Sequence, residues 1–209
     1  MMQISPPGDK LARLMNPDEP SQSGGPPAGP SDGAAFTQQF NHQPVGARIP
    51  ERIARGAFTT GVIILDSPKE FVLDFLQGLS RPFQVVSRVI MTPATFEELH
   101  NALRDNLNKY AEAFGPIPPL PKPPNPARPS IQEIYETFKV PEELHSGNYA
   151  NTVLIGHTPA EMFMDFITGF YPTAAVSSRV FMAVTQAPRI LETVTMALTQ
   201  YNHRYRGGR

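Results

Sequence analysis

The sequence has no cysteine, and its formal net charge is only −1. Without cysteine the chain forms no disulfide framework, no cysteine-ligated zinc site and no thiol nucleophile. This absence fits the cytoplasm, where we expect the protein to reside. The near-zero charge provides no long-range attraction for nucleic acid or for an anionic membrane, so neither is expected as a partner. No stretch reaches about 18 consecutive apolar residues, which predicts that no helix crosses a membrane.

Sequence signatures of catalysis and of metal binding are also missing. The chain contains no GxxxxGK[ST] phosphate loop, no GxGxxG dinucleotide turn and no GxSxG nucleophile turn. None of its five histidines lies four residues from another histidine, so we expect no metal site. These absences predict a non-enzymatic protein that carries no cofactor.

Proline is abundant instead, and its distribution divides the chain. Of the 24 prolines, eight lie in residues 1–48 and eight in residues 116–129. The first segment is also rich in glycine and serine and buries too little apolar surface to order itself, which predicts a disordered N-terminal arm. The second segment is typical of a polyproline-like linker. After it, Ser130 and Glu133 form a capping box that predicts a short connecting helix over 130–139.

The rest of the sequence is one segment written twice. Residues 49–110 align with residues 140–201 at a constant offset of 91, and 17 of the 62 aligned positions are identical. A period this long marks a domain-sized unit rather than a solenoid repeat. We therefore predict two copies of one small fold, at 49–115 and 140–202, followed by a basic flexible tail at 203–209.

Each copy has the pattern of three strands followed by one long helix. β-Branched and alternating apolar residues predict the strands. In the first copy, Thr92 and Pro93 form a helix start, and apolar residues then recur every three or four positions as far as Phe114, just before Gly115. The predicted strands are 57–65, 70–76 and 83–91 in the first copy and 149–156, 161–167 and 174–182 in the second. The second helix is predicted to start near Pro188.

The two meanders are predicted to pack on each other. One side of each antiparallel sheet is expected to carry its own helix, while the other side still presents apolar residues that would form a large exposed patch. We therefore predict an α+β protein whose repeats bury these helix-free sides together, or share one sheet, as a pseudo-two-fold intramolecular dimer. The alternative is that these sides bind another subunit. The residues concerned are Val72, Leu76, Val86, Ile90, Phe163, Ile167 and Phe181.

An acid and an arginine recur together in both copies. If the second and third strands form a hairpin, Asp74 lies opposite Arg88 and Asp165 lies opposite Arg179. The first interpretation is a structural cross-strand ion pair that fixes the register. One alternative is a ligand or anion site that uses the arginines. Acid–base catalysis is the other, although no nucleophile or histidine recurs with the pair.

Several runs of residues carry a family resemblance. In the second copy they are Asn148-Tyr149-Ala150-Asn151, Thr158-Pro159-Ala160-Glu161, Met164-Asp165-Phe166 and Ser178-Arg179-Val180-Phe181-Met182. In the first copy they are Leu73-Asp74-Phe75, Ser87-Arg88-Val89-Ile90-Met91-Thr92-Pro93 and the helical run from Ala102 to Tyr110. Together they resemble an uncharacterised bacterial domain family of short β-β-β-α proteins. The second copy departs from it at Ala183-Val184-Thr185, where the family has a Ser/Thr-Pro helix start. The resemblance implies a small domain that pairs, and it implies no activity.

Three functional hypotheses follow from these patterns. The first is a non-enzymatic interaction or assembly module, a tandem-repeat scaffold that binds a protein partner or a second copy of itself. The second is a regulator that binds a small ligand or anion through Arg88 and Arg179. The third is a chaperone-like holdase with exposed sheet faces, which rests on a fold-level likeness to a bacterial export chaperone. Buried Asp–Arg pairs would favour the first, an open pocket with both arginines exposed the second, and a wide apolar groove the third.

Overall fold

A computed structural model describes residues 46–121, 130–170 and 172–207 of the chain. The predicted disordered arm therefore lies outside the described residues up to residue 45, and so does the linker from residue 122 to residue 129. The elements of the first repeat are α1 Glu51–Ala54, β1 Ala57–Phe58, β2 Gly61–Asp66, β3 Phe71–Gln77, β4 Phe83–Met91 and α2 Pro93–Phe114. Those that follow are α3 Ile131–Thr137, β5 Phe138–Lys139, the 3-10 turn η1 Glu142–Leu144, β6 Asn148–Tyr149, β7 Thr152–His157, β8 Glu161–Thr168, β9 Ala175–Ala183, η2 Val184–Gln186, α4 Ala187–Tyr201 and the π-helical turn η3 Asn202–Arg206. The α+β class is as predicted.

The first strand of each repeat divides between the two sheets. We predicted one strand over 57–65, but β1 runs parallel to β9 of the other repeat, whereas β2 runs antiparallel to β3 of its own. In the second repeat, β6 likewise runs parallel to β4, and β7 runs antiparallel to β8. Pairing therefore leads from β2 through β3 and β4 to β6, and from β7 through β8 and β9 back to β1. Each repeat contributes strands to both sheets.

A short step between β1 and β2 carries the chain from one sheet to the other. The amide of Thr59 donates to the carbonyl of Phe181 at 2.8 Å, and the next amide, that of Thr60, donates to Leu76 at 2.7 Å. Two consecutive amides are thus bonded to different sheets, which satisfies the backbone at the break. The two equivalent amides of the second repeat make the same kind of bonds.

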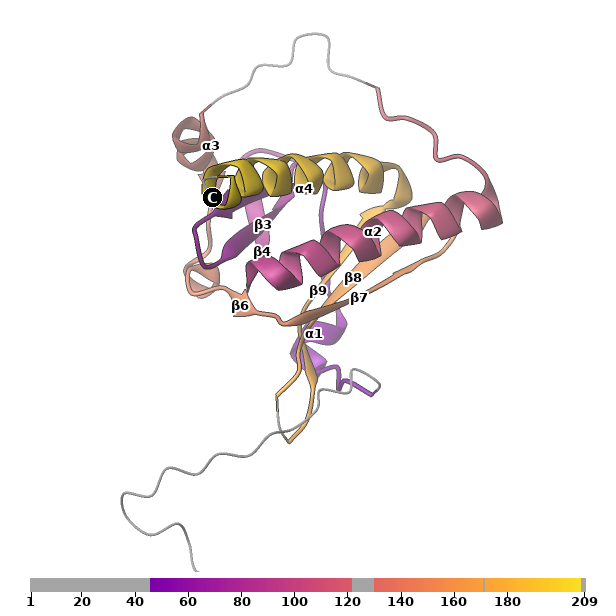
Figure 1. Ribbon diagram of the computed structural model, residues 1–209, viewed down its shortest axis with the longest axis horizontal. Coiled ribbons are helices and arrows are strands. Elements are labelled where there is room, and N and C mark those ends of the chain that lie inside the picture. The colour runs from indigo at the N-terminus through magenta and orange to yellow at the C-terminus, as the bar shows by residue number, and fades with distance from the viewer. Residues whose placement is uncertain (1–45, 122–129, 171, 208–209) are drawn as a thin grey trace, which may run out of the picture. The chain divides into compact units, whose positions relative to one another are not determined.

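The two long helices lie next to each other on one side of the strands, and each reaches the other repeat (Figure 1). We expected each helix to cover its own sheet. In the structure α2 makes its main strand contacts with β7 and α4 with β2, although Phe96 of α2 also stacks on Phe71 of its own repeat. The last buried side chain of each helix fastens this arrangement: the Tyr110 hydroxyl donates to the carbonyl of Pro159 at 2.7 Å, and that of Tyr201 to Pro68 at 3.1 Å. Tyr110 thus contacts the β7–β8 turn of the second repeat, and Tyr201 contacts the β2–β3 turn of the first repeat.

The helix-covered sides of both sheets share one hydrophobic core. Side chains of β3, β4, β8 and β9 meet there beneath α2 and α4, and Phe75 contacts Phe166 with ring centres 5.5 Å apart. The expectation that the helix-free sides close on one another is therefore wrong. Each helix stripe needs an apolar surface, and the common core supplies it. The strand residues of the core are Phe71, Leu73, Phe75, Val89, Met91, Ile155, Met162, Met164, Phe166, Val180 and Met182.

The helix ends follow their local sequence signals. The Thr92 hydroxyl accepts a hydrogen bond from the amide of Thr95 at 3.3 Å, and α2 ends before Gly115, whose φ is +86°. The capping box of Ser130 and Glu133 is present in both directions. These features depend only on neighbouring residues, which is why the sequence predicts them.

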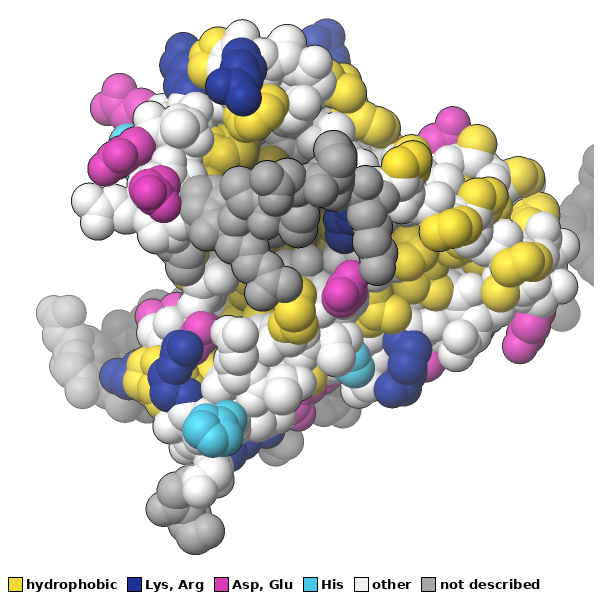
Figure 2. All heavy atoms as spheres, turned by 90° about the horizontal axis from the view of Figure 1, so that it is seen from above, with side chains coloured by type: hydrophobic (Ala, Val, Ile, Leu, Met, Phe, Trp, Pro, Cys, Tyr) yellow, Lys and Arg dark blue, Asp and Glu magenta, His cyan; other side chains and the backbone are white. Residues whose placement is uncertain are grey.

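Two boundaries and the exposure of one residue differ from the prediction. The connecting helix ends at Thr137 rather than 139, because β5 pairs with the start of β4. The tail expected to be flexible continues α4 as a helical turn, and Arg204 pairs with Asp66 at 2.6 Å. Phe114, the last residue of the predicted apolar stripe, is 49% exposed. Figure 2 shows hydrophobic side chains gathered toward the end of the molecule at which α2 finishes, on the right in both views.

Candidate functional site

Both recurring acid–arginine pairs form across their hairpins. The strand register places Asp74 opposite Arg88 and Asp165 opposite Arg179. Arg88 donates through Nε and Nη2 to the two carboxylate oxygens of Asp74 at 2.7 Å each, and Arg179 does the same to Asp165 at 2.6 Å each. The aspartates are buried, with 0% and 3% of their surface exposed. Two parallel charged hydrogen bonds per pair fix both register and side-chain geometry.

The electrostatics of the pairs keep the arginines charged. The hydrogen bonding of Arg88 to the Asp74 carboxylate raises the pKa of Arg88 above its ordinary value, against the opposing effect of burial. The hydrogen bonding of Arg179 to the Asp165 carboxylate raises the pKa of Arg179 in the same way. A buried pair adds little net stability over apolar residues, but removing one partner strands the other charge. The pairs therefore act as strong constraints on the fold.

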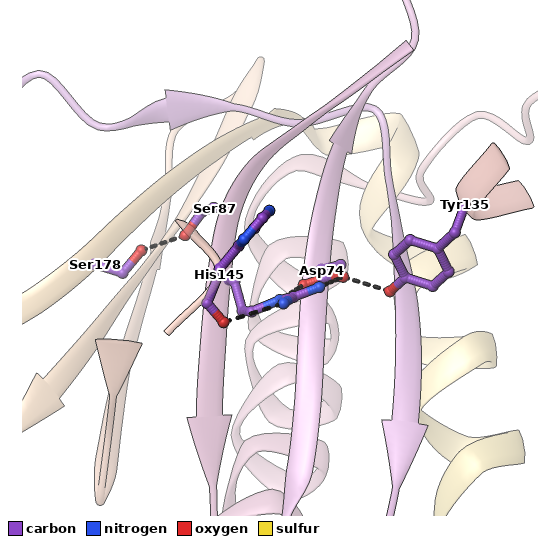
Figure 3. A network of polar contacts seen from close by, with 6 residues as sticks. Asp74, Ser87, Tyr135, His145 and Ser178 are labelled. Atoms are coloured by element: carbon purple, nitrogen blue, oxygen red, sulfur yellow. Dashed lines mark hydrogen bonds and ion pairs between the residues drawn. The ribbon is translucent and has the colours of Figure 1, made fainter. Parts of the chain in front are cut away.

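Tyr135 is a third member of the first pair that sequence reasoning missed. Its hydroxyl, presented by α3, donates to Oδ2 of Asp74, while Nη1 of Arg88 donates to the carbonyl of His145 at 3.3 Å (Figure 3). Burial first, and then the bond to Asp74, raises the pKa of the Tyr135 phenol far above its ordinary value of 10.0. The available signal was an aromatic residue inside a short capped helix, and no periodicity linked it to Asp74.

The second pair has different surroundings. The guanidinium of Arg179 lies over the rings of Phe163 and Phe181, 5.8 Å and 5.9 Å from their centres, which is cation–π geometry. Among the described residues, Asp165 is hydrogen-bonded through its side chain to Arg179 alone. The position that matches Tyr135 at the offset of 91 is residue 44, a proline outside the described residues. The strand register is the same in both repeats, but the two ion pairs lie in different environments.

A pair of equivalent serines meets where the two repeats face each other. The hydroxyls of Ser87 and Ser178, which are 91 residues apart, lie 2.6 Å from each other (Figure 3). Both side chains are buried. Sequence reasoning missed this pair, although one signal existed: a serine recurs at the same place within an apolar strand side in both copies. Equivalent residues of the two repeats therefore touch at this point.

Residues 49–56 and 140–147, here called the lead-in segments, precede β1 and β6. An equivalent glycine in each segment brings it against the other repeat. Gly56 and Gly147 have φ of +61° and +66°, where side chains other than glycine are strained. A Cβ on Gly56 would lie 2.3 Å from the ring of Phe181, and one on Gly147 would lie 2.9 Å from Cδ1 of Ile90. Each glycine also adjoins the arginine of the opposite pair. The helix-free sides of β4 and β9 are thus partly covered by these crossing segments.

The two predicted arginines do not form one joint site. Arg88 is bound to Asp74 and to the carbonyl of His145, and Arg179 is bound to Asp165 on the other sheet. Within residues 46–121, 130–170 and 172–207, no group of three or more acidic or histidine side chains is placed to hold a metal ion. In the same part of the chain, no helix is both long and apolar enough to cross a membrane.

The fold and the site define an α+β protein built from two tandem copies of one domain. Comparison with known families shows that the chain belongs to the family described as "Protein of unknown function (DUF3467)", which matches residues 18–118 and, a second time, residues 122–206. The resemblance to an uncharacterised domain present in two copies is thereby confirmed. No curated protein and no solved structure matches the chain.

Proposed function

We propose that the protein is a non-enzymatic interaction module, in which two joined repeats act as a pseudo-two-fold dimer and bind a protein partner on the outer side of β7, β8 and β9. The burial of Asp74 and Asp165 under their own arginines supports this proposal. A carboxylate held by two charged hydrogen bonds is a poor general base, whereas it fixes strand register well.

Reciprocal contacts support the pseudo-dimer. The pairing of β1 with β9 recurs, at the offset of 91, as the pairing of β6 with β4. The bond from Tyr110 to Pro159 recurs as the bond from Tyr201 to Pro68. In a two-fold dimer, residue i of one subunit contacts residue j of the other and the reverse contact also forms. The same strand exchange would join two separate single-repeat chains.

The proposed binding surface contains three phenylalanines in register, here called the aromatic row. Phe58, Phe181 and Phe163 lie on neighbouring strands β1, β9 and β8. The ring of Phe163 continues the row across β7, because it lies against Gly156, where a Cβ would be 2.4 Å away. Next to the row, Leu154 is 55% exposed, and Phe58 is itself 40% exposed. Aromatic residues and arginine are enriched at the centres of protein interfaces.

The observation that carries the proposal is the contrast between the two outer sides. On β2, β3 and β4, the helix α3 supplies a hydroxyl, that of Tyr135, to the buried Asp74. On β7, β8 and β9, the described residues place no such donor beside Asp165. Helix α3 therefore shows how a short helix can cover an outer side of this kind. We infer that the partner presents a short helix whose hydroxyl-bearing side chain points at Asp165.

The test is a comparison of two surface variants in the full chain. Leu154→Glu places a charge beside the aromatic row, and Leu79→Glu is the matched control, because Leu79 is 71% exposed on the β3–β4 loop. Proteins captured from the native cell are identified by mass spectrometry, and each is then purified and titrated against the variants. We expect the partner to bind wild type and Leu79→Glu and to lose affinity for Leu154→Glu.

The other outcomes are equally decisive. Equal binding of the partner by wild type, Leu154→Glu and Leu79→Glu would exclude this surface. Failure of every captured protein to bind the purified wild-type chain would also exclude it. If the retained partner is a second copy of the chain, sedimentation will show a Leu154-dependent dimer, and the module is then a self-assembly element. If removal of residues 1–45 is needed before any partner binds, the surface is covered by the chain's own arm.

A further inference from the structure

A small cavity lies where the two repeats meet. It has a volume of about 180 Å³, and both repeats line it. Its polar lining consists of Ser87, Ser178, Arg52, Arg179 and Asn148, and the remaining described lining residues are small or apolar. Several water molecules at roughly 30 Å³ each would fill such a volume, and so would one small ion with some water.

The serine pair leaves one hydrogen-bond donor without an acceptor. Each of the two hydroxyls carries one hydrogen, and only one of these hydrogens lies between Ser87 and Ser178. Among the described residues, neither hydroxyl makes a second hydrogen bond. Both side chains are buried, with 5% and 4% of their surface exposed. A buried donor without an acceptor is unfavourable. A ligand in the cavity that accepts a hydrogen bond from this hydroxyl would therefore be stabilised.

The lining of the cavity carries a net positive charge. Arg179 uses Nε and Nη2 on Asp165, which leaves Nη1 for another acceptor, whereas Arg88 has given its Nη1 to His145. Because Asp165 balances the charge of Arg179, the net positive charge comes from Arg52. No carboxylate is found among the described residues that line the cavity.

The hydrogen-bond donors that line the cavity are not duplicated by the internal repeat. At the offset of 91, Arg52 is matched by Glu143 and Asn148 by Ala57, so neither of these two donors recurs in the other copy. The side chains of Arg52 and Asn148 have no hydrogen bond within the described residues. The cavity is thus lined by two arginines, an asparagine and two serines, and each of these side chains can donate a hydrogen bond.

We propose that this cavity binds a small oxyanion, a free phosphate or carboxylate group, held by Arg52, Arg179, Asn148 and the serine pair. The guanidinium of Arg52 can donate two hydrogen bonds to the oxygens of such an anion, and Arg179 can add a hydrogen bond from Nη1. Because the anion contacts both repeats, its binding also strengthens their association. The site differs from the aromatic row, and the two tests change different residues.

The test is calorimetric titration of the full chain at constant ionic strength, with inorganic phosphate in one arm, acetate in a second and chloride as the reference. Arg52→Gln removes the net charge, and Arg55→Gln is the control, because Arg55 is exposed on the same lead-in segment and does not line the cavity. We expect phosphate or acetate to bind, and Arg52→Gln to weaken binding at least about tenfold while Arg55→Gln leaves it unchanged.

Nuclear magnetic resonance of the same samples locates the ion. Binding of the anion should shift the amide signals of Asn148 and Ser178. The variant Ser178→Ala should also bind the anion more weakly than wild type. No binding of either anion at millimolar concentration would overturn the proposal. Equal weakening by Arg55→Gln, or shifts that gather away from Asn148 and Ser178, would also overturn it, because these results indicate general surface attraction.

Discussion

Replacing Arg88 by methionine should cost a large part of the stability of the fold. Asp74 is fully buried, and the substitution removes both of its charged hydrogen bonds, so that only the Tyr135 hydroxyl remains as a side-chain donor. Breaking a buried ion pair by removing one partner costs about 3–5 kcal/mol. Domains are stable by only about 5–15 kcal/mol in total. We therefore expect Arg88→Met to shift the urea midpoint strongly, as followed by circular dichroism.

The matched rescue removes the stranded charge. Adding Asp74→Leu and Tyr135→Phe to Arg88→Met replaces the carboxylate and its remaining donor by apolar groups. Buried pairs replaced in this way are often neutral in stability, so most of the loss should be recovered. A loss below about 1 kcal/mol in Arg88→Met, or a triple variant as unstable as the sum of its single changes, would refute the reasoning, since either result shows that the groups are not coupled.

Two further predictions concern Tyr135 and the lead-in glycines. Tyr135→Phe should lower the free energy of unfolding by about 1.5 kcal/mol. Because the folded-state pKa of this phenol is raised above 10.0, the advantage of wild type should be constant below pH 10 and shrink above it, as urea titrations at pH 7 and pH 11 will show. Gly147→Ala should cost about 1–3 kcal/mol by thermal unfolding, because strain at positive φ adds to a contact with Ile90. A Gly147→Ala variant that unfolds at the temperature of wild type would contradict this reasoning.

Features that depend on near neighbours could be predicted from the sequence. The cap at Thr92, the stop at Gly115 and the position of β4 were all correct, because capping residues, glycine and strict alternation act within a few residues. The register of Asp74 on Arg88 was also correct, since a short hairpin loop leaves few ways to pair two strands.

The members of the candidate site that were missed depend on distant contacts. Tyr135 reaches Asp74 across 61 residues, and Ser87 reaches Ser178 across 91. A serine on an apolar strand side signals that a partner must exist, because a buried hydroxyl needs a hydrogen bond. It does not say which of the remaining residues supplies that partner.

The sequence by itself determined that one small α+β unit occurs twice, which side of each strand is apolar, and where the long helices begin. Only the tertiary structure decided which copy each element packs on. Because the copies share one apolar pattern, a strand or helix finds a matching surface on its own repeat and on the other. The short breaks after β1 and β6 resolve this choice: they send each chain segment into the opposite sheet, and each long helix reaches across to the first strand of the other repeat.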